Sequence, residues 1–211
     1  MIDRYFGEQD RARVAAAVRD AEARSRGQIV PVVVEKCDHY PEARYRGALL
    51  AAGLATLVVV LAFPHLGAWE LPLVQLGAGL AGALVSMWDP LERLLVGPRE
   101  LTEAARERAV RAFHEQGLHR TAEGTGVLVF AALFERRAVI LGDRGIDAKM
   151  GAAEWQRALD ALLLGLRRDD PASGFCEAIG LAGGRLAESF PRAAGEERAN
   201  ELADELRISP S

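Results

Sequence analysis

The chain has 211 residues and a formal net charge of −4 at pH 7. A mildly negative chain is not a general nucleic-acid binder, so no nucleic-acid partner is expected. Its two cysteines, Cys37 and Cys176, are too few for a disulfide framework or a zinc site, and we expect two reduced thiols. Nearly all basic residues are Arg, beside abundant Ala and Gly, which indicates GC-rich coding and a bacterial source.

The first segment predicts a helix followed by a buried strand. Apolar residues recur at helical spacing between Glu8 and Ser25. The following run, Gln28–Cys37, is rich in β-branched residues and predicts a strand that is buried on both faces. Pro31 fits such a strand only near its start or at an edge. The polar beginning, Met1–Phe6, does not resemble a secretory signal.

Two uncharged apolar runs follow, Gly47–Phe63 and Leu71–Trp88. A bilayer core of about 30 Å needs about 17–25 apolar helical residues, and backbone groups in lipid must pair internally, so both runs should be helices. A short break with Pro64, Gly67 and Glu70 makes the helices antiparallel. The sequence therefore predicts a transmembrane helical hairpin in a lipid bilayer. The alternative is a pair of helices buried in a soluble core.

Residues around the two runs favour the membrane. Trp69 and Trp88 lie where aromatic belts occur, and small residues recur four apart in the second run, which lets helices approach closely. We expect the basic residues beside the runs to contact anionic lipid headgroups; these are Arg44, Arg46, Arg93 and Arg99. The break contains no Lys or Arg, so both termini should face the cytoplasm of a bacterial inner membrane crossed twice.

The second half begins with a helix and a β-hairpin. The helix starts at a capping signal at Thr102 and ends near Gly117. The runs Gly126–Phe134 and Ala138–Asp143 predict two strands joined by the turn Glu135-Arg136-Arg137. That turn is either an anion-binding site or an ordinary exposed turn.

Two further helices, over Ala152–Arg168 and Ser173–Ser189, end the patterned part of the chain. Arg192–Ser211 is charged and poor in large apolar residues, so we expect a mobile tail. The order of elements predicts an α/β fold, a small mixed sheet with helices on both faces. The expected organisation is one domain made of residues 1–44 and 99–192, a hairpin over 45–98, and a tail over 193–211.

Several motifs resemble the TPM domain family. The likeness lies in GQIVPVVVEKC, from Gly27, and TGVLVFAALFERRAVILGDRGID, from Thr125. Its most specific parts are Thr125-Gly126-Val127-Leu128, Glu135-Arg136, and Gly142-Asp143 followed by Gly145-Ile146. The resemblance implies an α/β/α sandwich, and the family often carries a phosphatase-like label.

Other residues resemble a membrane-inserted branch of that family, in which a transmembrane hairpin interrupts the domain after its first strand. These are Trp155, Phe190-Pro191, and Asn200-Glu201-Leu202 with Asp204. Gly47–Trp88 holds the place of that hairpin. The chain departs from the family at Gln28, where Glu is frequent, and at Gly124-Thr125, where soluble members often have Asp-Asn. Both are polar positions associated with the cleft of soluble members.

Three carboxylates are candidate ligands for a hard cation such as Ca²⁺ or Mg²⁺: Glu123, Asp143 and Asp147. A bound ion of this kind could polarise a phosphoryl oxygen. Glu123 precedes one strand of the predicted β-hairpin and Asp143 follows the other, so the two should lie side by side. Alternatively these carboxylates only solvate loops, and Asp147 caps the next helix.

The preferred hypothesis is a membrane-anchored module on the cytoplasmic face that binds or assembles with an unknown protein partner. The chain has no P-loop, nucleophile-elbow, HExxH or EF-hand motif to indicate catalysis. The alternative is a divalent-metal-dependent, phosphatase-like hydrolase that uses Glu123 and Asp143. A transporter subunit is disfavoured, because neither apolar run holds an ionisable residue that would mark an ion path.

Overall fold

The computed structural model describes residues 2–63, 65, 67, 69–121, 124–147, 152–192 and 202–209. The chain divides into two compact units. Met1–Cys37 and Thr102–Ser211 form one, the sheet unit, and Asp38–Leu101 form the other, the hairpin unit. The sheet unit is thus built from two stretches of chain that are far apart in sequence.

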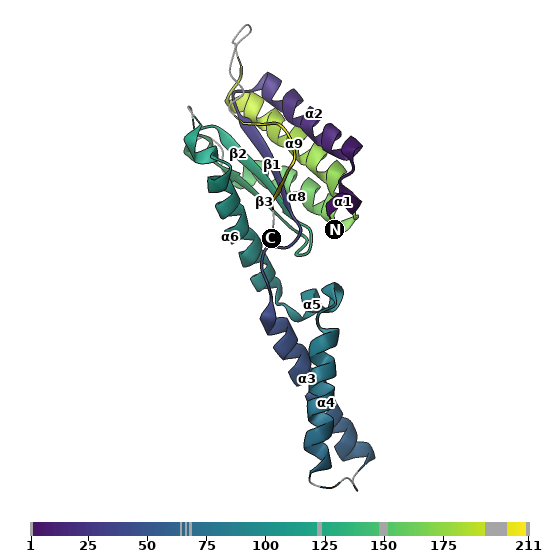
Figure 1. Ribbon diagram of the computed structural model, residues 1–211. Coiled ribbons are helices and arrows are strands. Elements are labelled where there is room, and N and C mark those ends of the chain that lie inside the picture. Colours follow the sequence, from purple (N-terminus) through teal and green to yellow (C-terminus); the bar gives the residue numbers. More distant parts are fainter. Residues whose placement is uncertain are drawn as a thin grey trace. The chain divides into compact units, whose positions relative to one another are not determined.

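A four-stranded mixed sheet in the order β3-β2-β1-β4 forms the centre of the sheet unit (Figure 1). β1 (Gln28–Val34) runs parallel to β2 (Gly126–Ala132), and β2 forms the predicted antiparallel hairpin with β3 (Arg137–Gly142). Every residue of β1 and β2 is buried, which explains why both read as continuous apolar runs. The predicted small mixed sheet is confirmed.

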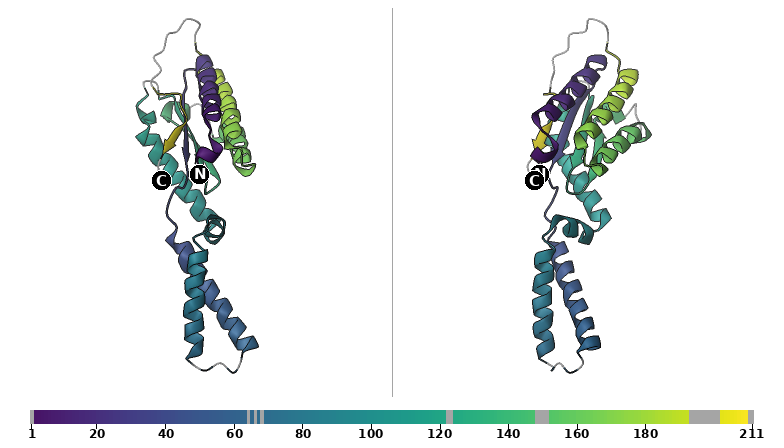
Figure 2. Two further views of the ribbon diagram at one scale, coloured as in Figure 1. Left: turned by 45° about the vertical axis from the view of Figure 1, so that its right-hand side comes forward. Right: turned by 90° about the vertical axis from the view of Figure 1, so that its right-hand side faces the viewer.

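Helices cover one face of this sheet (Figure 2). They are α1 (Ile2–Tyr5), α2 (Glu8–Arg24), α7 (Arg144–Asp147), α8 (Ala152–Arg167) and α9 (Pro171–Ser189). Their apolar side chains, such as Phe175 of α9, form one buried cluster with alternate residues of β1 and β2, among them Val33 and Val129. The alternation follows from the two-residue period of a strand.

The opposite face is covered by α6 (Pro98–Glu115) and the short 3₁₀ helix η1 (Leu118–Arg120). Ala109 and Phe113 of α6 share a second buried cluster with Val32 and Phe130 of the sheet. Helices on both faces complete an α/β/α arrangement, as predicted.

The fourth strand, β4 (Arg207–Ser209), was not predicted from the sequence. It pairs in parallel with Val32–Val34 at the end of β1. On α6, the buried Arg108 hydrogen-bonds the Ser209 hydroxyl and pairs with Glu115 at 3.2 Å. The expectation of a mobile tail is therefore wrong for Arg207–Ser209, because a central strand and a buried guanidinium both bind this segment.

Pro31 lies inside β1, where it is opposite Val129 of β2. On the other side of β1, pairing with β4 begins only at Val32. A proline has no N–H to donate to a neighbouring strand, and at this position β4 does not pair with β1, so no donor is needed. The expected edge character of Pro31 therefore holds on the β4 side only.

The hairpin unit contains α3 (Pro41–Ala62), which packs against α4 (Glu70–Val85), and then α5 (Asp89–Leu95). Among the helices of the described ranges, α3 alone is long and apolar enough to cross a membrane, and α4 qualifies only together with α5. The axes of α4 and α5 are bent by 107°. The predicted pair of apolar helices is present, and its insertion in lipid stays a prediction.

Small residues allow α3 and α4 to approach closely. A Cβ added at Gly82 would lie 2.5 Å from the Ala51 Cβ and 2.5 Å from the Gly47 carbonyl oxygen. A Cβ added at Gly47 would overlap the Ser86 hydroxyl. Gly77 on the outside of α4 meets nothing within 4 Å. Part of the small-residue pattern therefore marks the seam between the helices, as expected for close helix packing.

Candidate functional site

The loop before β2 and the loop after β3 meet at one end of the sheet. The Asp143 N–H donates to the Gly126 carbonyl at 2.8 Å, and the Gly145 N–H donates to the Gly124 carbonyl at 3.1 Å. A Cβ added at Gly124 would lie 3.6 Å from Oδ2 of Asp143. The two loops therefore lie side by side, as antiparallel pairing of β2 and β3 predicts.

Asp143 also organises its own loop. Its Oδ1 accepts a hydrogen bond from the Arg144 N–H at 2.7 Å, and its carbonyl accepts one from the Ile146 N–H at 2.9 Å. These bonds shape the beginning of the short helix α7. One carboxylate oxygen thus has a structural partner, while Oδ2 lies toward Gly124.

The other two predicted ligands cannot be compared with Asp143 in this way. Glu123 lies outside the described residues, and so does the side chain of Asp147, whose backbone ends α7. Within the described ranges, no group of three or more His, Cys, Asp or Glu residues is arranged to hold a metal ion. A Ca²⁺ or Mg²⁺ site formed by Glu123, Asp143 and Asp147 stays a prediction.

The two positions that depart from the family pattern belong to the scaffold. The Thr125 Oγ1 donates to the Arg26 carbonyl at 2.9 Å. The buried Gln28 accepts a hydrogen bond on Oε1 from the Leu202 N–H at 3.2 Å. These bonds join the segment just before β1 to the loop before β2, and β1 itself to the C-terminal segment. Sequence reasoning missed them because the partners are 99 and 174 residues apart.

At the other end of the sheet, the β2–β3 turn contacts both segments at which the sheet unit is interrupted. Glu135 is only 1 % exposed, and its Oε1 accepts a hydrogen bond from the Cys37 N–H at 2.9 Å. Arg137 donates from Nε to the Thr102 Oγ1 at 3.0 Å. Because these charged side chains have partners within the protein, the turn has a structural role: it holds Cys37 and Thr102 by hydrogen bonds. The anion-binding alternative therefore loses support.

Cys37 and Cys176 are free thiols, and both are partly buried. Burial raises the pKa of the Cys176 thiol above its ordinary value. Since the thiolate is the nucleophilic form, a raised pKa makes Cys176 a poor nucleophile at neutral pH. A covalent catalytic role for this residue is disfavoured.

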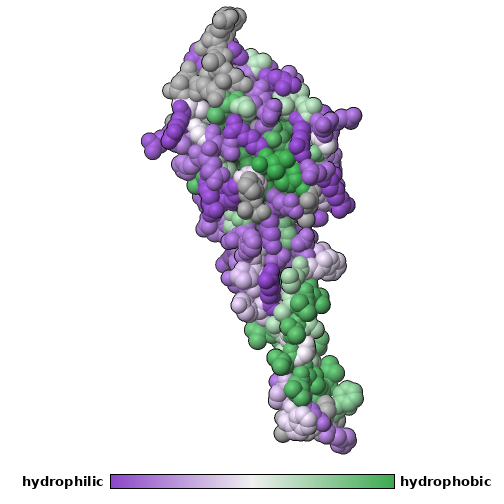
Figure 3. Space-filling view, viewed as in Figure 1, coloured by the Kyte–Doolittle hydropathy of each residue, from purple (hydrophilic) through white to green (hydrophobic). Residues whose placement is uncertain are grey.

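A second candidate surface is the outside of the hairpin unit. Large apolar side chains point away from the seam, such as Leu49 and Leu61 of α3 and Leu76 of α4, which are 73 %, 74 % and 72 % exposed. Figure 3 shows hydrophobic residues gathered over this part of the chain. A surface of this size and polarity marks a contact with a membrane or with another protein.

The uncharged polar side chains of the two apolar stretches, Thr56, Gln75 and Ser86, point into the seam or onto their own helix. Gln75 donates from Nε2 to the Thr56 Oγ1 at 2.7 Å, and Thr56 donates to the Ala52 carbonyl at 2.8 Å. Ser86 donates to the Gly82 carbonyl at 2.6 Å. Apolar groups outside and hydrogen-bonded polar groups inside are the reverse of a water-soluble helix pair.

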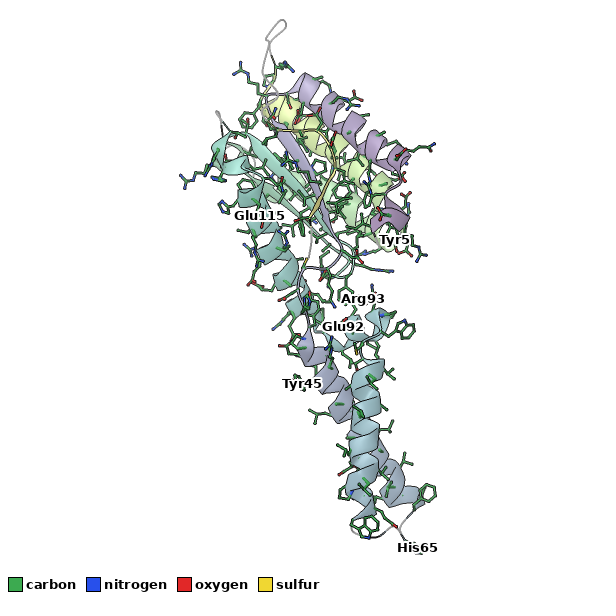
Figure 4. The ribbon with its side chains drawn as sticks, in the orientation of Figure 1. Tyr5, Tyr45, His65, Glu92, Arg93 and Glu115 are labelled. Atoms are coloured by element: carbon green, nitrogen blue, oxygen red, sulfur yellow. The ribbon has the colours of Figure 1, made fainter. Side chains whose placement is uncertain are left out.

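The four predicted headgroup contacts have different environments. Arg46 pairs with Glu100 at 2.7 Å and donates to the Leu95 carbonyl at 2.8 Å. The hydrogen bond from Arg46, with another from the Gly97 N–H, lowers the pKa of the Glu100 carboxyl. The remaining three have no hydrogen-bond or ion-pair partner in the described part of the chain: Arg44, Arg99 and Arg93, the last labelled in Figure 4.

Residues 96–184 match the family model of the TPM domain. This span runs from the segment before α6 to near the end of α9. It includes β2, β3, the loop before β2 and the loop after β3. Comparison with curated proteins gives no match.

Among solved structures, the chain is similar to the NMR structure of the BA42 protein from the psychrophilic bacterium Bizionia argentinensis sp. nov.. The TM-score is 0.62 at 19 % identity, and the alignment covers 99 % of this chain and 99 % of that chain. Likeness at this identity concerns the fold alone. The sequence match over residues 96–184 supports a TPM domain in this part of the chain, and the similar fold agrees with it.

Proposed function

We propose that this protein is a membrane-anchored TPM domain, a member of the membrane-inserted branch of the family. In this proposal the hairpin unit sits in the lipid bilayer of a bacterial inner membrane. The sheet unit works on the cytoplasmic face as a binding or assembly module for a protein partner.

One observation carries the proposal, the inverted polarity of the hairpin unit. Most leucines and valines of α3 and α4 are exposed, and Thr56, Gln75 and Ser86 have hydrogen-bond partners within the hairpin. In water each exposed side chain of this size forgoes about 1.5–3 kcal/mol of burial, whereas in hydrocarbon an unpaired polar group costs several kcal/mol. Lipid therefore suits both the outside and the inside of the hairpin.

The apolar part of α3 is slightly shorter than a typical hydrocarbon core is thick. The uncharged helical part of α3, Gly47–Ala62, is about 24 Å long at 1.5 Å per residue, against a hydrocarbon core of about 30 Å. Phe63 and Trp69 at the far end of the hairpin add length at the interface. Local thinning of the bilayer accommodates the remaining mismatch at modest cost.

The near end of the hairpin suits a headgroup region. α5 is bent by 107° from α4, so with α4 across the bilayer, α5 lies along the membrane surface. Trp88 and Leu94 are exposed there, 68 % and 78 %, as expected for interfacial anchors. Arg44, Arg93 and Arg99 supply positive charge on this side, which by the positive-inside rule is cytoplasmic.

Membrane fractionation tests the anchor. We expect the full-length chain to stay in the membrane pellet after an alkaline carbonate wash and to need detergent for release. A chain that remains in the supernatant after ultracentrifugation would contradict the proposal.

Cysteine labelling tests the topology. In a chain with both native thiols changed to Ser, Glu70→Cys at the hairpin tip should react with a membrane-impermeant maleimide on intact spheroplasts. Arg99→Cys should react only after the membrane is broken. Labelling of both cysteines only after rupture would exclude a hairpin that reaches the outer face.

The alternative function is hydrolysis of a phosphate ester with help from Ca²⁺ or Mg²⁺. In the NMR spectrum of the micelle-embedded chain, either ion should shift resonances near Gly124–Gly126 and Gly142–Gly145 if the predicted site binds. The shifts should vanish in Asp143→Asn and persist in Asp160→Asn, a matched change on the exposed side of α8. Absence of shifts at millimolar ion concentration excludes the metal site. Phosphate release from an ester that is lost in Asp143→Asn would favour the hydrolase over the binding module.

A further inference from the structure

Two apolar grooves run along opposite sides of the seam between α3 and α4. The larger, about 970 Å³, is lined by Leu54, Val58, Val74 and their neighbours. The smaller, about 570 Å³, has a floor of small residues, Ala48, Ala52, Gly79 and Ala83, with leucines at its sides. Both open to the surroundings of the hairpin, so in a bilayer both are reached by lipid.

The two grooves differ at their ends. The smaller groove is also lined by Arg44 and Tyr45, whereas none of the described residues that line the larger one is charged. Arg44 is exposed and has no hydrogen-bond or ion-pair partner in the described ranges, and Tyr45, labelled in Figure 4, is 71 % exposed. The nearby Arg46 is instead bound to Glu100. A positive charge therefore sits at the end of one apolar groove and not of the other.

The length of the smaller groove also points to its occupant. From Arg44 to Ala52 the helix rises by about 12 Å, close to the hydrocarbon depth of one leaflet, which is about 15 Å. The far end of the groove is at Gln75, whose amide is held by Thr56. A ligand of one-leaflet length with an anionic end and an apolar body fits these features.

We propose that this groove binds one anionic phospholipid of the cytoplasmic leaflet, which rests on the proposed function because it requires the hairpin to be in the bilayer. The Arg44 guanidinium contacts the phosphate, an anion that suits its forked donors. The Tyr45 ring lies at the polar–apolar boundary, as tyrosines do at membrane interfaces. One acyl chain lies along Ala48, Ala52 and Gly79.

Native mass spectrometry of the full-length chain tests the proposal. The chain, purified in detergent, is incubated with an equimolar mixture of phosphatidylglycerol and phosphatidylcholine. We expect one retained lipid per chain, with phosphatidylglycerol favoured about fivefold, the ratio that about 1 kcal/mol of headgroup attraction per cation produces. Retention of the two lipids in equal amounts would overturn the proposal.

Matched variants separate a specific site from general charge. Arg44→Gln should abolish the preference, while Arg99→Gln, which removes the same charge away from the groove, should keep it. Gly79→Leu fills the groove and should abolish retention, while Gly77→Leu adds the same side chain to the open face of α4 and should not. Equal effects within either pair, or dimers without lipid, would contradict a lipid site.

Vesicle flotation distinguishes failure of the lipid site from failure of the membrane anchor. A wild-type chain that floats with vesicles but retains no lipid contradicts only the lipid site. A chain that does not float contradicts the membrane anchor as well.

Discussion

Gly124 adopts a left-handed backbone, with φ +64, next to the Asp143 loop. Gly124→Ala should cost about 1–2 kcal/mol of unfolding free energy, since an L-residue is strained in that conformation. The same change at Gly180, exposed on α9 with nothing within 4 Å of an added Cβ, should stabilise by about 0.5–1 kcal/mol. Chemical denaturation of both variants measures the difference, and shifts of the same sign would refute this account of the loop.

Asp170 caps α9, where its Oδ1 accepts a hydrogen bond from the Ser173 N–H at 3.1 Å. Hydrogen bonds from the Ser173 side chain and backbone lower the pKa of the Asp170 carboxyl. Asp170→Ala should therefore cost about 1 kcal/mol at pH 7, and Asp170→Asn only a few tenths, because Asn also caps helices.

The pH dependence of that cost follows from the lowered pKa. The carboxylate's contribution is fully present above its unfolded pKa of about 3.9 and is lost as pH falls through the lower folded value. Denaturation of wild type and Asp170→Ala at a series of pH values should show the gap between them closing in acid. A gap that stays constant to low pH would argue against a charged cap.

At the scale of elements, strands and helices with strong local patterns were predictable, and β4 was not. β1 and β2 are uninterrupted β-branched runs, and α8 and α9 carry apolar residues at helical spacing. β4 has three residues, too few to display a period, and it forms only because β1 has an open edge at Val32–Val34. Its pairing belongs to the tertiary structure.

The seam of the hairpin offers an element-scale test. Gly82→Ala should destabilise the α3–α4 pair by about 1–3 kcal/mol, because its Cβ would overlap Ala51 and the Gly47 carbonyl. Gly77→Ala has no such neighbour and should be neutral or slightly stabilising. Loss of helical circular dichroism in micelles with a rising dodecyl sulfate fraction measures both. Equal midpoints for the two variants would exclude Gly82 as the point of closest approach.

At the scale of the whole molecule, the hairpin interrupts a domain whose parts pair across it. All residues of the two buried clusters come from the sheet unit, from both sides of the interruption. Glu135 and Arg137 contact Cys37 and Thr102, the residues at which the chain leaves and re-enters this unit. The β2–β3 turn therefore holds the two ends of the interruption near each other.

Replacing residues 38–101 by a flexible linker should for this reason leave the sheet unit folded. A Gly/Ser linker of about ten residues spans roughly 17 Å, enough for two ends held by the same turn. A cooperative unfolding transition and protected amides in β1 and β2 would bear this out. A linker variant that is compact but whose β1 and β2 amides exchange rapidly with solvent would mean that the hairpin unit is needed for folding.

Much of the candidate site lay within reach of sequence reasoning, because neighbouring strands joined by a short turn place their ends together. That argument correctly brought the loops of Gly124 and Asp143 side by side. It gave no role to Gln28, Thr125 or Glu135, since each bonds to a residue about 100 or more positions away. Such partners follow from the packing of the sheet and leave no local pattern.

The amino-acid sequence alone determined the features that depend on near neighbours: two uncharged helices, a buried β-hairpin and amphipathic helices with their ends. The spacing of apolar residues and the distribution of charge are local properties, so they can be read along the chain. Only the tertiary structure decided which buried strand β4 joins, which arginine is bound by Glu100 and which groove ends at Arg44. These depend on the distance between segments remote in sequence, which packing alone sets.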